Sequence, residues 1–202
     1  MIDKKLFVSV GIGLLVAICA SFMSGFAKEC VQIRESVLRL HILANSDSQE
    51  DQALKLSVRD RILAQTQDLF YQVTSTEDAK ETAQENLEKI IAIAQREIAR
   101  QGYDYQVNAE VCNMFFDTRV YDNFSLPAGR YDAVRITIGE AKGKNWWCVL
   151  YPPMCLPCAM PESELEENLT SQQAEIIEKP QHYKVQFAVI EIWEKIKNLF
   201  QS

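Results

Sequence analysis

Residues that interrupt regular secondary structure are scarce in this sequence, with 7 glycines and 6 prolines among 202 residues. This composition excludes collagen-like and low-complexity chains. Basic residues form no long run, and 21 Lys and Arg against 28 Asp and Glu give a formal net charge of −7. A protein that binds nucleic acid needs a basic surface, so nucleic acid is not expected as a partner. The length and the 48% share of hydrophobic residues predict one folded domain with a short appendage.

Sequence motifs of common active sites are also missing. There is no GxSxG and no HExxH, and the only two histidines are His41 and His182. The acidic stretch NSDSQEDQ lacks the glycine that a calcium loop needs for its sharp turn. Cys155 and Cys158 have the spacing of a redox or zinc motif, but no second pair accompanies them and the prolines around them indicate an irregular turn. We therefore expect neither a resident metal nor a cofactor.

One long apolar run is present, at the N-terminus. Lys4 and Lys5 precede 22 uncharged residues, from Leu6 to Ala27, that end in small residues. This pattern is typical of a secretory signal peptide at residues 1–27, and cleavage after Ala27 is favoured over retention. A retained signal anchor is the alternative, because about 20 apolar residues span a bilayer; a buried core helix is the remaining one. The first two readings place residues 28–202 outside the membrane, with membrane contact through the N-terminal segment if it stays uncleaved.

Export changes the interpretation of the cysteines, because disulfides persist outside the cytosol. Beyond Cys30, the exported part contains four disulfide candidates: Cys112, Cys148, Cys155 and Cys158. Five cysteines allow at most two bridges within the chain. One thiol is left free or pairs between chains.

Hydrophobic spacing predicts an α+β domain. Strand periodicity appears at residues 36–45, 103–111, 131–138, 146–150 and 183–190. A glycine-rich connection predicts that the third and fourth of these strands form a hairpin. Helical spacing appears at 49–71, 75–102 and 191–200, whereas the acidic segment 161–179 is expected to be mobile or a short helix. The order predicts a mainly antiparallel sheet with a long helical hairpin packed on one face.

The predicted exported domain therefore has three parts. They are a core at about 36–155, the acidic segment 161–179, and a C-terminal strand and helix at 183–200.

Three stretches of this sequence resemble the stage II sporulation protein R family. They are LRLHILANSDSQEDQALKLSVRD from Leu38, LPAGRYDAVRITIG from Leu126 and GEAKGKNWWCVLYPPMC from Gly139. Together they cover most of the chain between Leu38 and Cys155, whereas the C-terminal part is less distinctive.

The resemblance implies a signalling role in endospore formation. A protein of this family is made in the forespore and secreted across the forespore membrane into the space between the two membranes. There it is expected to activate a membrane-embedded aspartic protease of the mother cell, which processes the precursor of sporulation sigma factor E. The resemblance implies a ligand for intercellular communication and not an enzyme.

Polar side chains of the first stretch are the candidate receptor-binding residues: Arg39, His41, Asn45, Asp47 and Asp51. A strand and the loop after it form a rigid presentation surface. The alternative is that these residues satisfy one another, with Arg39 paired to Asp47 or Asp51. Trp146 and Trp147 are expected on opposite faces of a strand, so one would lie in the core and the other would be available to a partner. Burial of both in the core is the alternative.

Three other functions stay open. A cell-envelope hydrolase would use His41 with carboxylate partners as acid and base. A redox or metal protein would act through Cys155 and Cys158. A structural envelope protein is the third.

Overall fold

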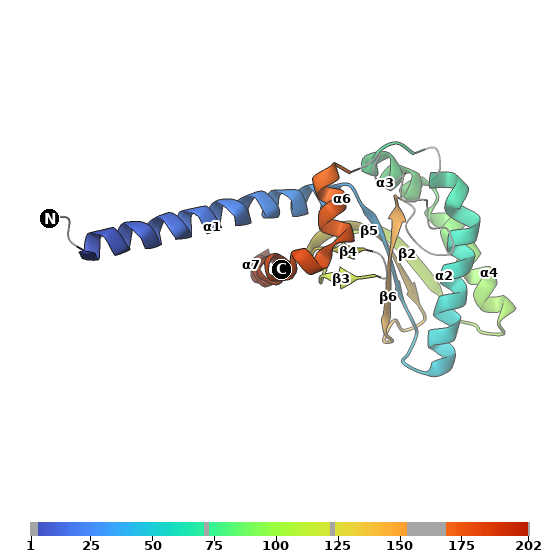
Figure 1. The fold of residues 1–202 in the computed structure, drawn as a ribbon. Coiled ribbons are helices and arrows are strands. Elements are labelled where there is room, and N and C mark those ends of the chain that lie inside the picture. The colour runs from blue at the N-terminus through green and yellow to red at the C-terminus, as the bar shows by residue number, and fades with distance from the viewer. Residues whose placement is uncertain (1–3, 71–72, 122–123, 153–168, 202) are drawn as a thin grey trace.

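A four-stranded sheet lies between two layers of helices, and a long N-terminal helix projects from this domain (Figure 1). The computed structural model describes residues 4–70, 73–121, 124–152 and 169–201. The fold is α+β, as the sequence predicts.

The N-terminal apolar run lies within helix α1, Lys4–Glu35, which continues beyond the predicted export segment. Its stretch from Val8 is long and apolar enough to cross a membrane, a property that a signal sequence shares. Apolar side chains from Val8 to Phe22 are exposed, whereas Phe26, Cys30 and Ile33 are buried in the domain. The last turns of α1 therefore belong to the folded domain.

The sheet has the strand order β2-β5-β1-β6. Its members are β1 (Leu38–Leu43), β2 (Val107–Phe116), β5 (Gly129–Ile138) and β6 (Asn145–Tyr151). β1 runs parallel to β5, and the pairs β1-β6 and β2-β5 are antiparallel, so the sheet is mainly antiparallel as predicted. A small hairpin, β3 (Arg119–Val120) with β4 (Ser125–Leu126), lies apart from this sheet.

The predicted hairpin of residues 131–138 with 146–150 is wrong. β1 lies between β5 and β6, so these two strands are not neighbours. The glycine-rich loop lets the chain step over one strand position, because its backbone binds the residues that follow β1: Lys142 N donates to Asn45 O and Gly143 N to Ala44 O, at 3.1 and 2.9 Å.

Three helices cover the first face of the sheet: α2 (Gln49–Phe70), α3 (Thr76–Glu85) and α4 (Leu87–Arg100). The predicted helical hairpin is present, with Ser75 capping α3 through a bond from Asp78 N to its hydroxyl. The second helix is broken at Asn86, whose side chain bonds back to the carbonyl of Thr82 at 2.8 Å. Such local bonding of Asn competes with helix continuation.

Both ends of the chain cover the second face. This layer contains the end of α1, helix α6 (Ser171–Glu178), a 3-10 turn (Pro180–His182) and helix α7 (Lys184–Gln201). The predicted strand at 183–190 is wrong, because Phe187, Ile190 and Glu194 are buried at helical spacing. The prediction rests on the alternation of apolar residues at 185, 187 and 189, which is typical of a strand. The acidic segment forms a helix over its second half, and residues 161–168 lie outside the described residues.

β1 is buried on both sides and links two apolar cores. Leu38, Leu40 and Ile42 point into the first core, under α2 to α4. The intervening Arg39 and His41 therefore point to the opposite face, where the second core lies. Two polar side chains of the central strand are thus buried on the side of the sheet where the second core lies.

Candidate functional site

The Arg39 side chain is fully buried in the second core. Its guanidinium carbon lies 4.2 Å from the ring centre of Phe116, 5.0 Å from that of Tyr131 and 5.9 Å from that of Trp147. Aromatic faces attract a cation through their quadrupole, most strongly away from water. The aromatic side chains from β2, β5 and β6 thus provide part of the stabilisation that a buried charge needs.

Phenolic oxygen, not carboxylate, is the polar partner of Arg39. Its Nη2 donates to Tyr121 Oη at 2.5 Å, and that hydroxyl donates to the Trp147 carbonyl at 3.3 Å. Nε and Nη1 have no hydrogen-bond partner among the described residues. Burial lowers the pKa of Arg39 from its ordinary value, and the two tyrosines oppose that change. The guanidinium is thus held mainly by aromatic rings and one hydroxyl.

His41 lies beside this cluster and is 3% exposed. Its ring centre is 5.6 Å from that of Trp147 and 6.0 Å from that of Phe116. Burial lowers its pKa to about 4, and the charges of Arg135 and Arg39 act in the same direction. The imidazole is thus neutral at pH 7 and enclosed. This position gives no support to His41 as the acid or base of a hydrolase.

The premise that Arg39 and His41 lie on a presentation surface is wrong, because the chain termini cover the face to which they point. The predicted pairing of Arg39 with Asp47 or Asp51 is also wrong. Arg39 forms no ion pair with any described residue.

The loop after β1 satisfies its own polar groups. Asp51 is 4% exposed, and its Oδ2 accepts bonds from Asn45 Nδ2 at 2.9 Å and Ser46 Oγ at 2.5 Å. The Ser48 hydroxyl accepts from Asp51 N at 3.1 Å and caps α2. Burial alone would raise the pKa of Asp51, but the bonds from Ser46, Asn45 and Tyr105 lower it. The carboxylate therefore fixes the loop to the start of α2.

The same loop is bound to the loop before β6. Asn45 Oδ1 accepts from Glu140 N at 2.9 Å, and the exposed Asp47 accepts from Lys144 N at 2.6 Å. A Cβ at Gly143 would collide with the Ser46 carbonyl, so only glycine permits this approach. Asn45, Asp47 and Asp51 thus hold two loops together, and a receptor contact through them stays a prediction.

Trp146 and Trp147 point to opposite faces of β6, as predicted, and both are partly exposed. The Arg59 guanidinium lies 4.2 Å from the ring of Trp146, and that of Arg119 lies 4.2 Å from the ring of Trp147. A guanidinium group therefore forms a cation–π contact with each indole. Their role in receptor binding stays a prediction.

Two of the cysteines are free thiols: buried Cys30 and half-buried Cys112. Cys112 as a disulfide candidate is therefore wrong. Burial raises the pKa of Cys30 to about 12, so this thiol stays protonated. Cys148 is buried in β6. Cys155 and Cys158 lie outside the described residues, and a bridge that involves these three stays a prediction.

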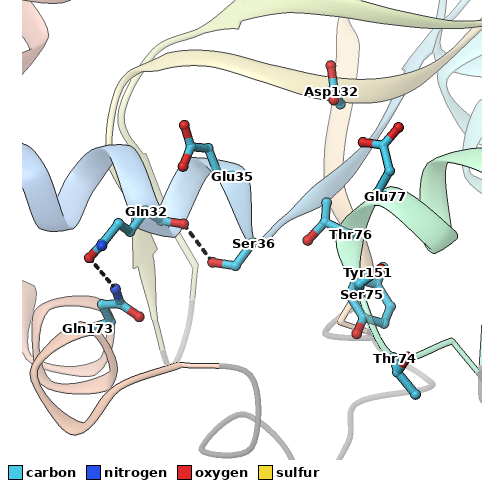
Figure 2. A pocket seen from close by; sticks show the side chains of 10 residues that line it. All are labelled: Gln32, Glu35, Ser36, Thr74, Ser75, Thr76, Glu77, Asp132, Tyr151 and Gln173. Carbon is cyan, nitrogen blue, oxygen red and sulfur yellow. Dashed lines mark hydrogen bonds between the residues drawn. The ribbon is translucent and has the colours of Figure 1, made fainter.

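A cavity of about 600 Å³ opens where α1, α3 and α6 meet the sheet (Figure 2). Its lining comes from five parts of the chain: Gln32, Glu35, Ser36, Thr74, Ser75, Thr76, Glu77, Asp132, Tyr151 and Gln173. Gln173 Nε2 donates to Gln32 Oε1 at 3.0 Å, which fixes α6 to the end of α1. Lys80 neutralises Asp132 at 3.1 Å.

This cavity presents hydroxyls, amides and carboxylates. Its acidic members do not form a metal centre, since no group of three His, Cys, Asp or Glu suited to a metal occurs in the described part of the chain. Hydrogen-bonding groups from distant parts of the chain therefore line this cavity. Sequence reasoning missed it because its residues are far apart in the chain, and only the Ser75 cap gave a signal.

The fold and the site together define an α+β domain that follows an apolar helix compatible with a signal or anchor segment, with its polar loop residues bound to one another. The family model of stage II sporulation protein R matches residues 34–160, so the chain belongs to that family. It is 36% identical over 153 residues to stage II sporulation protein R of Bacillus subtilis (strain 168), covering 73% of this chain and 68% of that protein. No solved structure matches the chain. Family membership supports a role in sporulation.

Proposed function

We propose that this protein is the exported signal of endospore formation that activates a membrane-embedded aspartic protease of the mother cell, which then processes the precursor of sporulation sigma factor E. The observation that carries this proposal is the family match over residues 34–160, which contains the whole sheet. Helix α1 is compatible with the route, because a signal or anchor segment places the domain that follows it across the membrane.

The contact with the protease is proposed to lie at β6. This strand is the last of the sheet, and no other strand among the described residues pairs with its outer edge. It presents the partly exposed indoles, each covered by an arginine. Trp and Arg are the residues that most often dominate protein interfaces. A strand of the partner would pair with the outer edge of β6, and an acidic loop of the partner would contact the two arginines.

The test is reconstitution in a host that does not sporulate. The protease and the sigma precursor are produced with the full chain, or with a chain that lacks residues 1–22, which stays inside and keeps Phe26 in its core. Precursor cleavage on a gel is expected only with the exported chain. Cleavage that is equal in both strains, or in a strain without this protein, would overturn the proposal.

A histidine variant separates a ligand from a hydrolase. His41→Gln is expected to retain activation, provided that its thermal unfolding shows a folded domain, with His182→Ala as the exposed control. Loss of activation in a folded His41→Gln chain, together with turnover of peptidoglycan by the wild type, would establish the hydrolase instead.

A surface variant tests the contact. Arg119→Glu reverses an exposed charge over Trp147, so we expect lower precursor cleavage at unchanged melting temperature. Arg96→Glu, on the opposite layer of helices, is the matched charge reversal and should leave cleavage intact. Equal cleavage with both variants would move the contact away from this edge.

A further inference from the structure

Helix α7 has two apolar faces, and only one of them packs against other residues that the structure describes. Phe187 and Ile190 are buried in the second core. The opposite face is an exposed stripe, at steps of three and four residues: Val185, Val189, Ile192, Trp193, Ile196, Leu199 and Phe200. Its exposed fractions run from 43% at Ile196 to 86% at Phe200. A contiguous apolar patch of this extent on a domain in water marks a contact surface.

The stripe lies close to the point where α1 enters the domain. The ring of Phe26 in α1 stacks on Tyr183 at 5.5 Å between centres and meets Phe187 edge-on at 5.5 Å. Arg34 of α1 pairs with Glu194 of α7 at 3.4 Å, both nearly buried. These contacts fix α7 beside the end of the exposed apolar part of α1, whose last fully exposed large side chain before them is Phe22.

The direction of α7 also matters. In Figure 1, α1 runs along the page, whereas α7 is seen nearly end-on beside it, so the two helices cross. A helix that crosses a membrane-spanning helix at its end lies along the membrane plane. α7 therefore has the position and the direction of an interfacial helix when α1 is in the bilayer.

We propose that the exposed stripe of α7 lies in the lipid interface of the membrane that α1 enters. Interfacial helices present Trp, Phe and Leu to the acyl boundary and keep charged groups on the other side. Trp193 is the residue that prefers this depth. Two of the three lysines of α7 are paired with acidic side chains, Lys195 with Glu191 and Asp117 and Lys197 with Glu194. Apolar burial, rather than attraction to anionic headgroups, is thus the source of the affinity.

This inference is independent of protease activation, and its test needs neither the protease nor the precursor. The full chain is reconstituted in phosphatidylcholine vesicles that carry bromine on their acyl chains, and tryptophan fluorescence is recorded. The chain has three tryptophans. Quenching is expected in the wild type and in Trp146→Phe, and its loss is expected in Trp193→Phe. Equal quenching in Trp146→Phe and Trp193→Phe would overturn the proposal.

A charged variant provides the second arm. Ile192→Glu introduces a charge into the stripe, whereas Ala92→Glu introduces one at an exposed alanine of α4, in the opposite layer of helices. Since α1 holds both variants in the vesicle, a difference in quenching between them reports where α7 lies. Ile192→Glu is expected to lose quenching and Ala92→Glu to retain it, with unchanged circular dichroism. Shielding of Trp193 that appears only when the protease is present would assign the stripe to a protein partner and contradict the lipid proposal.

Discussion

Arg39 shows how this domain tolerates a cation in its interior. The side chain lies between rings from three strands and donates to one phenol, with no ion pair among the described residues. A planar guanidinium stacks on rings, and a compact ammonium does not. The residue therefore acts as a flat packing element that carries a charge.

Replacement of Arg39 should reveal this role. Arg39→Lys is expected to lower stability by about 1–3 kcal/mol, because it leaves a buried, poorly partnered charge. Arg39→Met keeps the apolar stem without a charge and should cost less than the lysine variant. Thermal unfolding of the full chain in detergent micelles measures both. A lysine variant as stable as the wild type would contradict the stacking account.

Asp51 holds the loop after β1 to α2. Asp51→Ala leaves the donors of Asn45 and Ser46 without their acceptor, so we expect a loss of about 1–3 kcal/mol. Asp60→Ala, at a half-exposed carboxylate of the same helix, should change stability by less than about 0.5 kcal/mol. Urea unfolding measures the free energy of unfolding of both variants. Equal losses would show that the bonds to Asp51 add no stability.

Acid sensitivity is expected to depend on Glu97. Bonds from Arg100, at 2.9 and 2.7 Å, lower the pKa of Glu97 to about 2, although burial acts against them. Because the folded pKa lies below the ordinary 4.5, this carboxylate adds stability above pH 4.5 that is lost as the pH falls towards 2. In Glu97→Gln, the free energy of unfolding should therefore depend less on pH between these two values than in the wild type. Glu88 is exposed on the same helix, so Glu88→Gln should leave the fall in the free energy of unfolding at low pH unchanged.

At the scale of elements, the end of α1 is part of the core. Phe26 is 6% exposed between Tyr183 and Phe187, so Phe26→Ala is expected to cost about 3–5 kcal/mol. Phe22→Ala, one turn earlier and 77% exposed, is the matched control and should leave the melting temperature unchanged. The reverse order of stabilities would show that α1 does not pack as described. A cut after Ala27 would remove Phe26 as well, and would yield a less stable domain than the full chain.

Most elements could be predicted from local pattern, and the errors lie where tertiary contacts decide. The alternation of Leu38 to Leu43 and the cap at Ser75 are local signals, and both elements are present. The place of β1 between β5 and β6 is not local, because an intervening strand leaves no trace in the turn that follows β5. The apolar residues between 184 and 190 fit both the alternation of a strand and the spacing of a helix. The helix forms because it buries Phe187 and Ile190 in the second core, together with residues of α1.

The candidate site divides in the same way. Asn45, Asp47 and Asp51 are close in sequence, so a shared network could be anticipated. The burial of Arg39 could not, because the rings around it come from β2, β5 and β6, which lie far from Arg39 in the sequence. Residues of the cavity come from separate elements, which only the fold brings together.

At the scale of the whole molecule, the two ends of the chain close one face of the sheet (Figure 1). A chain that stops at residue 183 lacks α7 and exposes the second core, so we expect loss of cooperative heat unfolding and strong binding of an apolar dye. A chain that stops at residue 198 keeps Phe187 and Ile190 in the second core and loses the exposed Leu199 and Phe200, so it should unfold cooperatively. Cooperative unfolding of the shorter chain would show that α7 is dispensable for the fold.

The central position of β1 has a consequence for the order of folding. Leu38 pairs with Asp132 of β5 on one side and with Tyr151 of β6 on the other. Both partner strands are therefore synthesised long after β1. In an exported chain, β1 reaches the far side of the membrane early and waits, unpaired, until residue 151 has followed. Contacts of such long sequence separation slow folding, and an open apolar strand is prone to pair with other chains meanwhile. In such an exported chain, secretion rate and protection of the nascent strand, rather than final stability, are expected to limit the yield of folded domain.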